Sequence, residues 1–341
     1  MKKISLADVA KSLGVSKTLV SLVLNDRGDE KGINKDTQQR VRDKVKELNY
    51  KPNQFARGLR IGKSNTIGMV VADISNSFYA KMCRSIEDHC NLNGYNLIIC
   101  SSDENSEKES ELIQMLIDRQ VDGLIISTTQ NNNTDIVHLI KNKFPFVLID
   151  RNSSKTETNY VVVDNKEGAK KVVNHLVKLG NSSIGHLTIS PSHLSTIKER
   201  TQGYKDGLIA NGLKVNSNLI REVSFDNLKN DVFKHVKELL SAPNKVTALF
   251  VANNNIAVAC LECLKEMEMR IPQDVALVSF DDIDAFKLCS PPITAVSQPI
   301  EQMGKEAVDI ILSEINDGTT IGKFKKSSLP TELIIRKSCG N

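Results

Sequence analysis

Acidic, amide, guanidinium and aromatic side chains recur in this sequence directly after short apolar runs. Asp73 follows the run TIGMVVA, and Asp150 ends the run PFVLID. Carboxylates and amides bind hydroxyl groups, a guanidinium binds an anion or a hydroxyl pair, and an aromatic face covers a ring. The candidates for such a site are Asp73, Asn76, Phe78, Tyr79, Asp150, Arg200, Phe225, Asn253 and Asp281. Together they predict recognition of a small polar molecule, although each has a structural alternative, such as a loop cap for Asp150 or a core position for Phe78.

No enzyme signature accompanies these residues. The sequence has no G-x-x-x-x-G-K-[ST] phosphate loop, no G-x-G-x-x-G after a strand, and no H-E-x-x-H or G-x-S-x-G motif. Its six histidines are isolated from one another; His193 lies in a polar loop that can reach a cleft, but a surface histidine is the simpler interpretation. Cys260 and Cys263 form one CxxC inside an expected helix, without a second pair. We therefore expect no enzyme, no metal and no cofactor.

The elements that must position the polar residues are short strands alternating with helices. From about residue 65, apolar runs such as TIGMVVA, YNLIICS, SIGHLTI and VALVSF alternate with amphipathic stretches such as EKESELIQMLIDRQ and KEGAKKVVNHLVKLG. This alternation is typical of parallel sheets covered by helices, and the number of units predicts two sheets. Ligands of open parallel sheets bind beyond the carboxyl ends of the strands, which is where the candidate residues fall.

Length, composition and charge divide the chain into a basic head and a mildly acidic body. At 341 residues the chain predicts two or three domains, with 40% hydrophobic and 25% charged residues as in globular proteins. No apolar run approaches the roughly 20 residues of a membrane span, and the N-terminal MKKISLADVA lacks a signal-peptide core, so we expect a cytoplasmic protein. Residues 1–63 hold 15 Lys and Arg against 7 Asp and Glu, a net +8, whereas the remainder is −4. This asymmetry indicates that the head binds a polyanion, unless it is only a solvated lysine-rich surface.

Three helices are expected in the head. Ser5 with Asp8 forms a capping box for the first, Gly14 ends it, and Ser16 caps the second. A third helix is capped by Asn34 and carries Val41, Val45 and Leu48. A helix, a short glycine turn and a second capped helix make up the helix-turn-helix unit.

The second helix has a core face and a polar face. At 100° per residue, its apolar arc consists of Leu19, Val20, Val23 and Leu24, and the opposite side of Lys17, Thr18, Ser21, Leu22 and Asn25. At a DNA-reading helix, Lys17 can bind guanine or phosphate, and Thr18 and Ser21 can bond bases or backbone. Leu22 can press on a thymine methyl group; alternatively it packs on the loop after Asn25.

The stretches LADVAKSLGVSKTLVSLVLN, TQQRVRDKVKELNYKPNQFARGLR and NTIGMVVADISNSFYAKM resemble the N-terminal signature of the LacI/GalR (lactose-repressor) family of bacterial transcription regulators, and the similarity continues along the chain. The chain departs from the family at positions 19 and 22, where Leu replaces the usual Thr and Arg, and in the loop DRGDEKGI, which is about three residues longer than the commonest form. These departures leave DNA binding in place and the operator sequence open.

The resemblance implies a fold and the boundaries of its domains and lobes. It implies a small all-α helix-turn-helix domain at 1–50, a hinge helix at 51–63, and a two-lobed α/β core like that of periplasmic binding proteins. The first lobe is expected at 64–164 and 295–325, and the second at 165–294 and 326–341. The resemblance further implies that Leu59 wedges into the minor groove of the operator, with Arg57 neutralising phosphates. The positions expected to serve DNA binding are Ser5, Ser16, Lys17, Thr18, Ser21, Leu22, Asn25, Asn34, Asn53, Arg57 and Leu59.

The resemblance also implies an effector pocket lined by most of the candidates above. The chain departs from the family at Asn254, which replaces the usual Asp after Asn253. Position 194 is Leu where the purine-responsive branch has Arg, which disfavours a purine. The resemblance of the body to periplasmic sugar-binding proteins makes a sugar or sugar derivative the expected effector. We predict a homodimeric regulator, expected to act as a repressor, that binds a near-palindromic operator and interacts with no membrane. The alternative is a cytosolic or transport-type sugar-binding protein without a DNA-binding role. An inducer and a corepressor are both compatible with this pattern.

Overall fold

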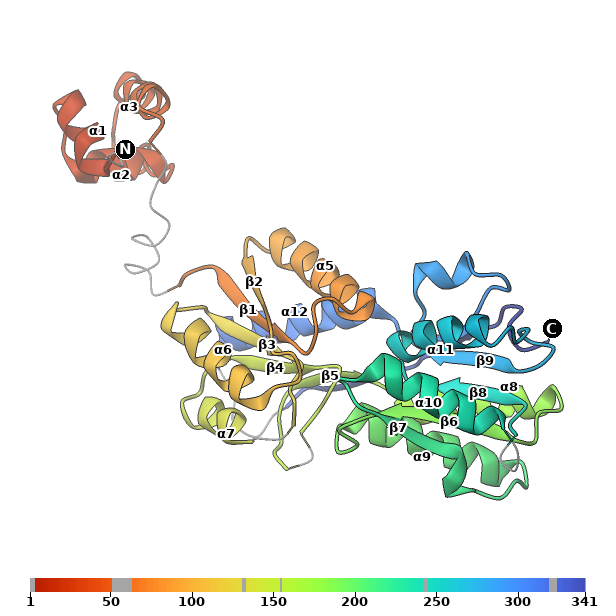
Figure 1. Ribbon diagram of the computed structural model, residues 1–341. Coiled ribbons are helices and arrows are strands. Elements are labelled where there is room, and N and C mark those ends of the chain that lie inside the picture. Colours follow the sequence, from red (N-terminus) through yellow and green to blue (C-terminus); the bar gives the residue numbers. More distant parts are fainter. Residues whose placement is uncertain are drawn as a thin grey trace. The chain divides into compact units, whose positions relative to one another are not determined.

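A computed structural model describes residues 4–50, 63–130, 133–153, 155–241, 245–318 and 324–340 (Figure 1). The chain divides into two compact units, residues 1–64 and 65–341. No helix within the described ranges is long and apolar enough to cross a membrane. We call residues 1–64 the head and residues 65–341 the core.

The head is a three-helix unit built around a small apolar cluster. Its helices are α1 (Leu6–Leu13), α2 (Lys17–Leu24) and α3 (Lys35–Glu47). The predicted caps are confirmed: Ser5 and Asp8 form a capping box, Gly14 has a left-handed φ of 69°, and the Ser16 and Asn34 side chains accept backbone N–H groups of the first turns of α2 and α3. Val20 and Val23 of α2 are buried in the cluster with Val9, Ala10 and Val41.

The long loop between α2 and α3 is held by a buried amide. Gln38 of α3 is 5% exposed, and its Nε2 donates to Asp29 Oδ1 at 2.7 Å and to the Ile33 carbonyl at 2.8 Å. Gly28 lies against the same side chain, where a Cβ would come within 2.5 Å of Gln38 Cδ. The extended loop is therefore an ordered part of the head.

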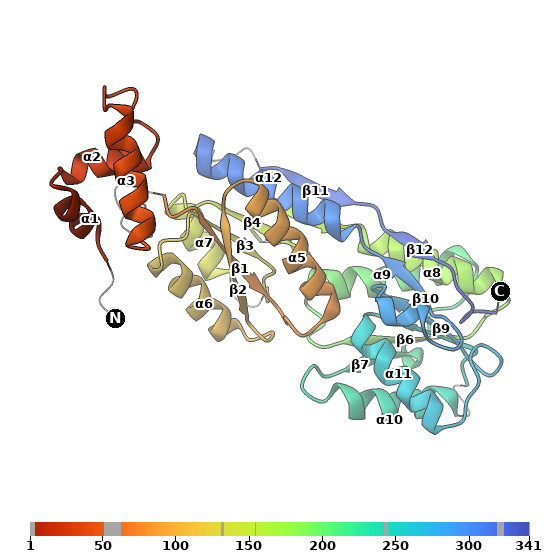
Figure 2. The ribbon, with the colours of Figure 1, turned by 90° about the horizontal axis from the view of Figure 1, so that it is seen from above.

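The core contains two six-stranded sheets, as predicted (Figures 1 and 2). The first sheet has the order β11-β5-β4-β3-β1-β2, with β1 (Thr66–Val71), β2 (Asn96–Ser101), β3 (Gly123–Ile126), β4 (Phe146–Ile149), β5 (Tyr160–Val163) and β11 (Lys326–Leu329). The second has the order β12-β10-β9-β8-β6-β7, with β6 (Ile184–Ile189), β7 (Ile220–Val223), β8 (Ala248–Val251), β9 (Ala276–Phe280), β10 (Thr294–Ser297) and β12 (Glu332–Ile334). All pairs are parallel except β10 with β12. An antiparallel edge strand on an otherwise parallel sheet is a common arrangement.

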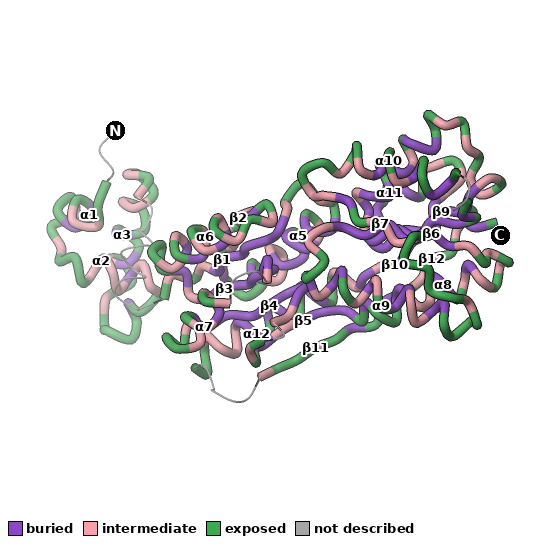
Figure 3. The backbone as a smooth tube through the Cα atoms, turned by 60° about the horizontal axis from the view of Figure 1, so that its bottom comes forward, coloured by how far each residue is buried: buried purple, intermediate pink, exposed green. Residues whose placement is uncertain are grey.

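Helices cover both faces of each sheet, so the central strands are buried (Figure 3). In the first lobe, α5 (Ser77–Leu92) and α12 (Ile300–Asp317) cover one face, and α6 (Ser106–Asp118) and α7 (Thr134–Lys141) the other. In the second lobe, α10 (Leu228–Leu240) and α11 (Asn254–Glu266) cover one face, and α8 (Asn165–Lys178) and α9 (Ser195–Ala210) the other. Two short 3-10 turns, η1 (Ser217–Leu219) and η2 (Asp284–Lys287), complete the second lobe.

The chain crosses between the lobes later than the sequence indicated. Strand β10 pairs with β9 of the second sheet, so residues 295–297 belong to the second lobe and not to the first. Strand β11 pairs with β5 of the first sheet, so residues 326–329 belong to the first lobe and not to the second. Figure 2 shows β11 and β12 following one another along the core. The crossings lie after β10 and after β11 because a crossing segment can leave a sheet only where its strand ends.

A buried histidine makes the second lobe sensitive to acid. His186 of β6 is stacked between Tyr204 and Phe250, with ring centroids 4.9 Å away on each side. Its Nδ1 lies 3.0 Å from the Phe250 carbonyl, and its Nε2 lies 3.3 Å from the Thr201 hydroxyl. A neutral ring can donate to the carbonyl and accept from the hydroxyl. Burial lowers the pKa of His186 from 6.5 to about 4.

We expect the second lobe to lose stability as the pH falls from 6.5 towards 4. The unfolded chain binds a proton at His186 in this window and the folded chain does not, so the free energy of unfolding drops by about 2 kcal/mol between pH 7.5 and 5. The His186→Phe substitution should flatten this part of the dependence while lowering the stability at neutral pH, because it leaves the Phe250 carbonyl without its donor. Urea unfolding at several pH values measures both effects. Equal slopes for the two proteins would contradict the assignment.

Candidate functional site

The outward face of α2 is polar and accessible, as the sequence predicted. Lys17 and Thr18 are exposed, and Ser21, Leu22 and Asn25 are half-buried. The apolar cluster of the described head includes the partly buried Leu19 and Leu24 but not Leu22. Leu22 therefore lies on the side of α2 that faces away from the apolar cluster of the head.

Five of the predicted DNA-binding side chains already have partners within the head, including Ser21, whose Oγ lies 3.4 Å from Asn25 Nδ2. The Ser5, Ser16 and Asn34 side chains accept backbone amides as helix caps. Asn25 Nδ2 donates to the Ser21 carbonyl at 2.6 Å, so this amide is folded back on the last turn of α2. These residues shape the unit that presents Lys17 and Thr18. Three other predicted positions, Asn53, Arg57 and Leu59, lie outside the described residues.

A cavity between the two lobes of the core brings all nine candidate polar and aromatic residues together. Asp73, Asn76, Phe78, Tyr79 and Asp150 reach it from the first lobe, and Arg200, Phe225, Asn253 and Asp281 reach it from the second. These residues follow β1, β4, β7, β8 and β9 or lie in the first two turns of the helices after the strands, as Arg200 does in α9 after β6. The cavity therefore lies beyond the carboxyl ends of both sheets, where ligands of open α/β sheets bind.

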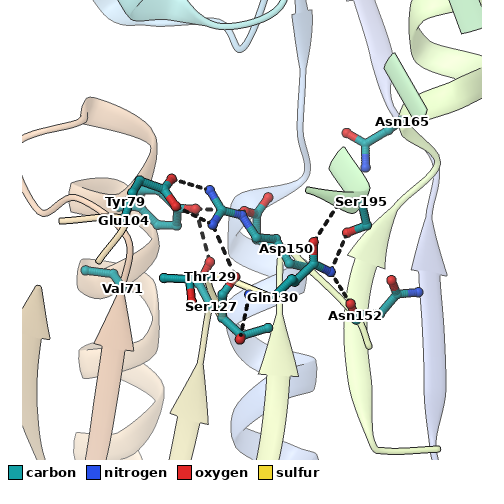
Figure 4. A network of polar contacts seen from close by, with 12 residues as sticks. Val71, Tyr79, Glu104, Ser127, Thr129, Gln130, Asp150, Asn152, Asn165 and Ser195 are labelled. Atoms are coloured by element: carbon teal, nitrogen blue, oxygen red, sulfur yellow. Dashed lines mark hydrogen bonds and ion pairs between the residues drawn. The ribbon is translucent and has the colours of Figure 1, made fainter. Parts of the chain in front are cut away.

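The wall formed by the first lobe is a hydrogen-bonded cluster around Tyr79 and Asp150 (Figure 4). The Tyr79 hydroxyl donates to Asp150 Oδ2 at 2.8 Å and lies 3.0 Å from Ser127 Oγ. Burial raises the pKa of Tyr79 well above 10, so the phenol stays protonated. Phe78 packs edge to face against Tyr79, with ring centroids 5.1 Å apart.

Arg151 and Glu104 complete this wall. Arg151 follows the same apolar run as Asp150 and was noted with it in the sequence, whereas Glu104 was not. Arg151 is 5% exposed and pairs bidentately with Glu104, at 2.8 Å from Nη1 to Oε2 and 2.5 Å from Nη2 to Oε1. Nη1 also donates to the Thr128 carbonyl at 3.2 Å, and Nε lies 3.6 Å from Asp150 Oδ2. The guanidinium is therefore largely neutralised within its own lobe.

Arg200 is the central cation of the wall formed by the second lobe. It is 4% exposed, and Nε donates to Asn165 Oδ1 at 2.8 Å while Nη1 donates to the Ala252 carbonyl at 2.7 Å. Its guanidinium carbon lies 3.8 Å from the centroid of the Phe280 ring. Because the pairing of Nη1 with Asp281 Oδ2 is long, at 3.4 Å, Arg200 is positioned mainly by these neutral groups.

Asp281 occupies the position in the second lobe that corresponds to Asp150 in the first. Each follows the buried strand that ends at its cavity wall, β9 or β4, and each has a left-handed φ, 68° for Asp281 and 66° for Asp150. Such a backbone is uncommon outside glycine and is tolerated best by Asn and Asp. Burial raises the pKa of Asp281, with Arg200 and the 2.6 Å hydrogen bond from Gln298 acting in the opposite direction.

Three further candidates are tied to local backbone. Asp73 Oδ1 accepts the backbone N–H and the hydroxyl of Ser75, at 2.8 and 2.6 Å. Asn76 and Asn253 cap α5 and α11 by accepting amides of their first turns. These side chains retain further acceptor and donor capacity towards the cavity, because an amide or carboxylate can form several hydrogen bonds.

Some residues of this site were missed for identifiable reasons. Glu104 and Asn165 follow β2 and β5, so the rule that selected Asp73 and Asp150 applies to them as well. Gln298 follows β10, a strand that the sequence analysis did not recognise. Within the described residues, no group of three or more His, Cys, Asp or Glu side chains could hold a metal ion. Phe225 and His193 lie in loops of the second lobe, and His193 Nε2 is 3.1 Å from the Thr129 carbonyl of the first lobe.

The fold and the cavity define a class of protein: a helix-turn-helix unit joined to a two-lobed α/β ligand-binding core. Family models agree with this division. The model described as "Bacterial regulatory proteins, lacI family" matches residues 5–53, and that of a periplasmic binding protein-like domain matches residues 173–339.

Two curated relatives match over nearly the whole chain. The chain is 32% identical to the probable HTH-type transcriptional regulator EndR of Paenibacillus polymyxa, over 92% of this chain and 91% of the relative. It is 33% identical to the HTH-type transcriptional repressor PurR of Aliivibrio salmonicida (strain LFI1238), over 92% of each chain. The chain belongs to the LacI family of DNA-binding transcriptional regulators. These relatives are transcriptional regulators and not enzymes.

Solved structures show the same fold. The complex of the transcriptional regulator CelR with cellobiose matches with a TM-score of 0.73 and 26% identity, over 98% of this chain and 99% of that chain. The lac repressor dimer bound to operator and the anti-inducer ONPF matches with a TM-score of 0.86 and 24% identity, over 99% of each chain.

Proposed function

We propose that this regulator is a homodimeric repressor whose two heads bind the half-sites of a near-palindromic operator, and whose effector is an uncharged sugar held between the lobes of the core. The observation that carries the effector proposal is the charge of the cavity. Four carboxylates line it, those of Asp73, Glu104, Asp150 and Asp281, against two guanidinium groups.

The state of the two arginines strengthens the charge argument. Both Nη atoms of Arg151 are paired with Glu104, so the charge of this guanidinium is largely balanced before a ligand binds. Arg200 remains, but its Nη1 lies 3.4 Å from Asp281 Oδ2 of its own lobe, and Asp150 of the other lobe lines the same cavity. A sugar phosphate or sugar acid would bring another negative charge into this buried, acidic space at a large desolvation cost. A neutral polyol instead donates hydroxyl hydrogens to the carboxylates.

The aromatic residues suit a sugar ring rather than a base. Phe78, Tyr79 and Phe225 line the cavity from both lobes, as expected for a ligand with an apolar ring face. Leu194, which stands where the resemblance implies an arginine in the purine-responsive branch, lines the same cavity and is 1% exposed. CelR, which has the same fold, was solved with cellobiose bound. We therefore favour a neutral sugar over a purine.

In the head, Lys17 and Thr18 are exposed on α2, which supports the proposal that this helix contacts the bases of the operator. The polar face also carries Leu22, which lies outside the apolar cluster and can contact a thymine methyl group. The net +8 of residues 1–63 supplies the attraction to phosphates.

The core offers an apolar surface for a second copy of the chain. Strand β2 is the last strand of the first sheet, and Ile99 on it is 37% exposed. Leu92, at the end of the adjacent α5, is 81% exposed. Because an exposed apolar edge strand favours pairing with another chain, we place the dimer contact of the first lobe here.

A gel-shift titration tests the proposal. The full-length protein and a fragment from upstream of its own gene are mixed at 50 and 200 mM salt, without sugar and with neutral sugars, sugar acids or sugar phosphates. We expect sequence-preferring binding that weakens by about 10³-fold or more with salt, because several phosphate contacts release counterions. At least one neutral sugar should change the affinity, with a matching rise in melting temperature.

The negatively charged analogue of the active sugar, its phosphate or its acid, is the matched control and should have no effect. DNA binding that responds to a sugar phosphate or a sugar acid but to no neutral sugar would reject the effector proposal. Binding without sequence preference would reject the operator proposal.

A further inference from the structure

One hydrogen-bonded contact spans the cleft at the rim of the effector cavity (Figure 4). Gln130 follows β3 of the first lobe, and Ser195 is the first residue of α9 in the second lobe. Gln130 Oε1 accepts the Ser195 backbone N–H at 2.7 Å, and Nε2 donates to the Ser195 hydroxyl at 3.1 Å. We infer that Gln130 is a positioning residue that caps helix α9 from the opposite lobe and thereby latches the lobes in this arrangement.

Helix α9 needs an external cap because its own N-cap residue cannot provide one. That residue is Leu194, and no side-chain cap hydrogen bond is present there. Four of the other seven α-helices described in the core, α5, α6, α8 and α11, are capped by the side chain of an Asn or Asp that precedes them, whereas α7, α10 and α12 have no side-chain cap. The first amides of a helix have no intrahelical partner, and an oxygen acceptor near them stabilises the helix. The amide oxygen of Gln130 supplies it.

Hydrogen bonds within the first lobe hold the side chain of Gln130 in place. Its orientation therefore does not depend on the contact with the second lobe. Nε2 also donates to the Asn152 carbonyl, and the backbone N–H of Gln130 donates to Thr128 Oγ1 at 3.1 Å. The residue has a left-handed φ of 59°. A second contact lies beside it, where His193 Nε2 is 3.1 Å from the Thr129 carbonyl. Two neighbouring residues of the first lobe thus contact two residues at the start of α9.

The latch affects the cavity because helix α9, which it caps, also carries Arg200. The cap lies one and a half turns before Arg200 on the same helix, so the first lobe orients the helix that presents the central cation of the second. An ion pair between the lobes is of a different kind: Lys81 and Asp284 lie 2.8 Å apart, but their side chains are 42% and 70% exposed. Exposed pairs of this kind contribute little and are screened by salt. Among these cross-lobe contacts, we therefore assign the latch to the Gln130 cap.

Hydrogen–deuterium exchange on the full-length protein, with neither DNA nor sugar, tests the latch. The Gln130→Leu substitution keeps the size of the side chain and removes its polar groups. It should raise the exchange rate of the segment containing Ser195 at least threefold, because the amide loses its acceptor and the lobes separate more often.

The Ser195→Pro substitution attacks the same contact from the second lobe. Proline is tolerated at the first position of a helix, and Leu194 before it has an extended ψ of 130° that suits a following proline. It removes the N–H that Gln130 accepts, so exchange should rise at least threefold in residues 127–130 of the first lobe. In the double variant that carries Gln130→Leu and Ser195→Pro, the exchange rate of residues 127–130 should be no higher than in the single variants. Lys81→Gln is the matched control, and it should leave both segments within twofold of the wild type.

The cross-lobe response separates a latch from a purely local cap. If Gln130→Leu leaves the Ser195 segment unchanged, or if Ser195→Pro affects only its own lobe, the latch is wrong. Because the measurement involves neither operator nor effector, this outcome is independent of whether the proposed function holds.

Discussion

Replacing Arg200 with lysine is expected to abolish the response of the protein to its effector while leaving operator binding in the absence of effector intact. The substitution keeps the charge but replaces a planar fork with a point charge. Lysine cannot donate to Asn165 Oδ1 and the Ala252 carbonyl together while lying flat on the Phe280 ring, as the guanidinium does. We expect sugar affinity to fall by about 10- to 100-fold, the value of one to two hydrogen bonds to a charged group.

Isothermal titration with the sugar that most raises the melting temperature of the wild type measures this loss, and a gel shift without sugar measures DNA binding. Arg221→Lys is the matched control: Arg221 lies on β7 of the same lobe, pairs with Glu238 at 3.5 Å and does not line the cavity. Arg221→Lys should leave sugar affinity within about twofold of the wild-type value, because Arg221 does not contact the cavity. Unchanged sugar affinity in Arg200→Lys would show that the effector binds elsewhere.

The sequence pattern located the cavity residues because parallel strands impose their own order. The side chains that follow the strands of one parallel sheet meet at a single edge, so the pattern groups Asp73 with Asp150 on the first sheet, and Asn253 with Asp281 on the second. That the two groups line one pocket was implied by the family resemblance. The pattern also identified the two faces of α2, since Val20 and Val23 are buried and Lys17 and Thr18 are exposed. Both predictions rest on local features of the sequence: the residues that follow a strand, and the periodicity of apolar residues along a helix.

Features that depend on non-local pairing were predicted less well. The strand of residues 294–297 was not recognised, and the crossing was expected before it, because a four-residue segment gives too little pattern to show which sheet it joins. Gln130 gave no signal at all, since its partner is a backbone N–H in the other lobe, 65 residues away in sequence. Arg151 stands beside Asp150 in the sequence, but its bidentate partner Glu104 is 47 residues away.

The head is expected to be the fragile part of the molecule, and Val20→Asp should show this. Val20 is fully buried in a cluster of five buried apolar residues. Placing a carboxylate there costs several kcal/mol, which approaches the roughly 3–5 kcal/mol that the core of so small a unit supplies. The head should therefore unfold, and operator affinity should fall by more than about 100-fold, the equivalent of about 2.7 kcal/mol.

The core is a separate compact unit, so its melting temperature and its response to sugar should be unchanged in Val20→Asp. Ser12→Asp serves as the matched control, because Ser12 is an exposed residue of α1 and the substitution adds the same charge to the head without entering the cluster. Ser12→Asp should weaken operator binding only through repulsion between the added charge and the DNA phosphates. We expect a few-fold loss of affinity at low salt and a smaller loss at high salt. If Val20→Asp and Ser12→Asp weaken binding equally, repulsion from DNA rather than unfolding explains both. If Val20→Asp also lowers the melting temperature of the core, the two units are not independent in folding.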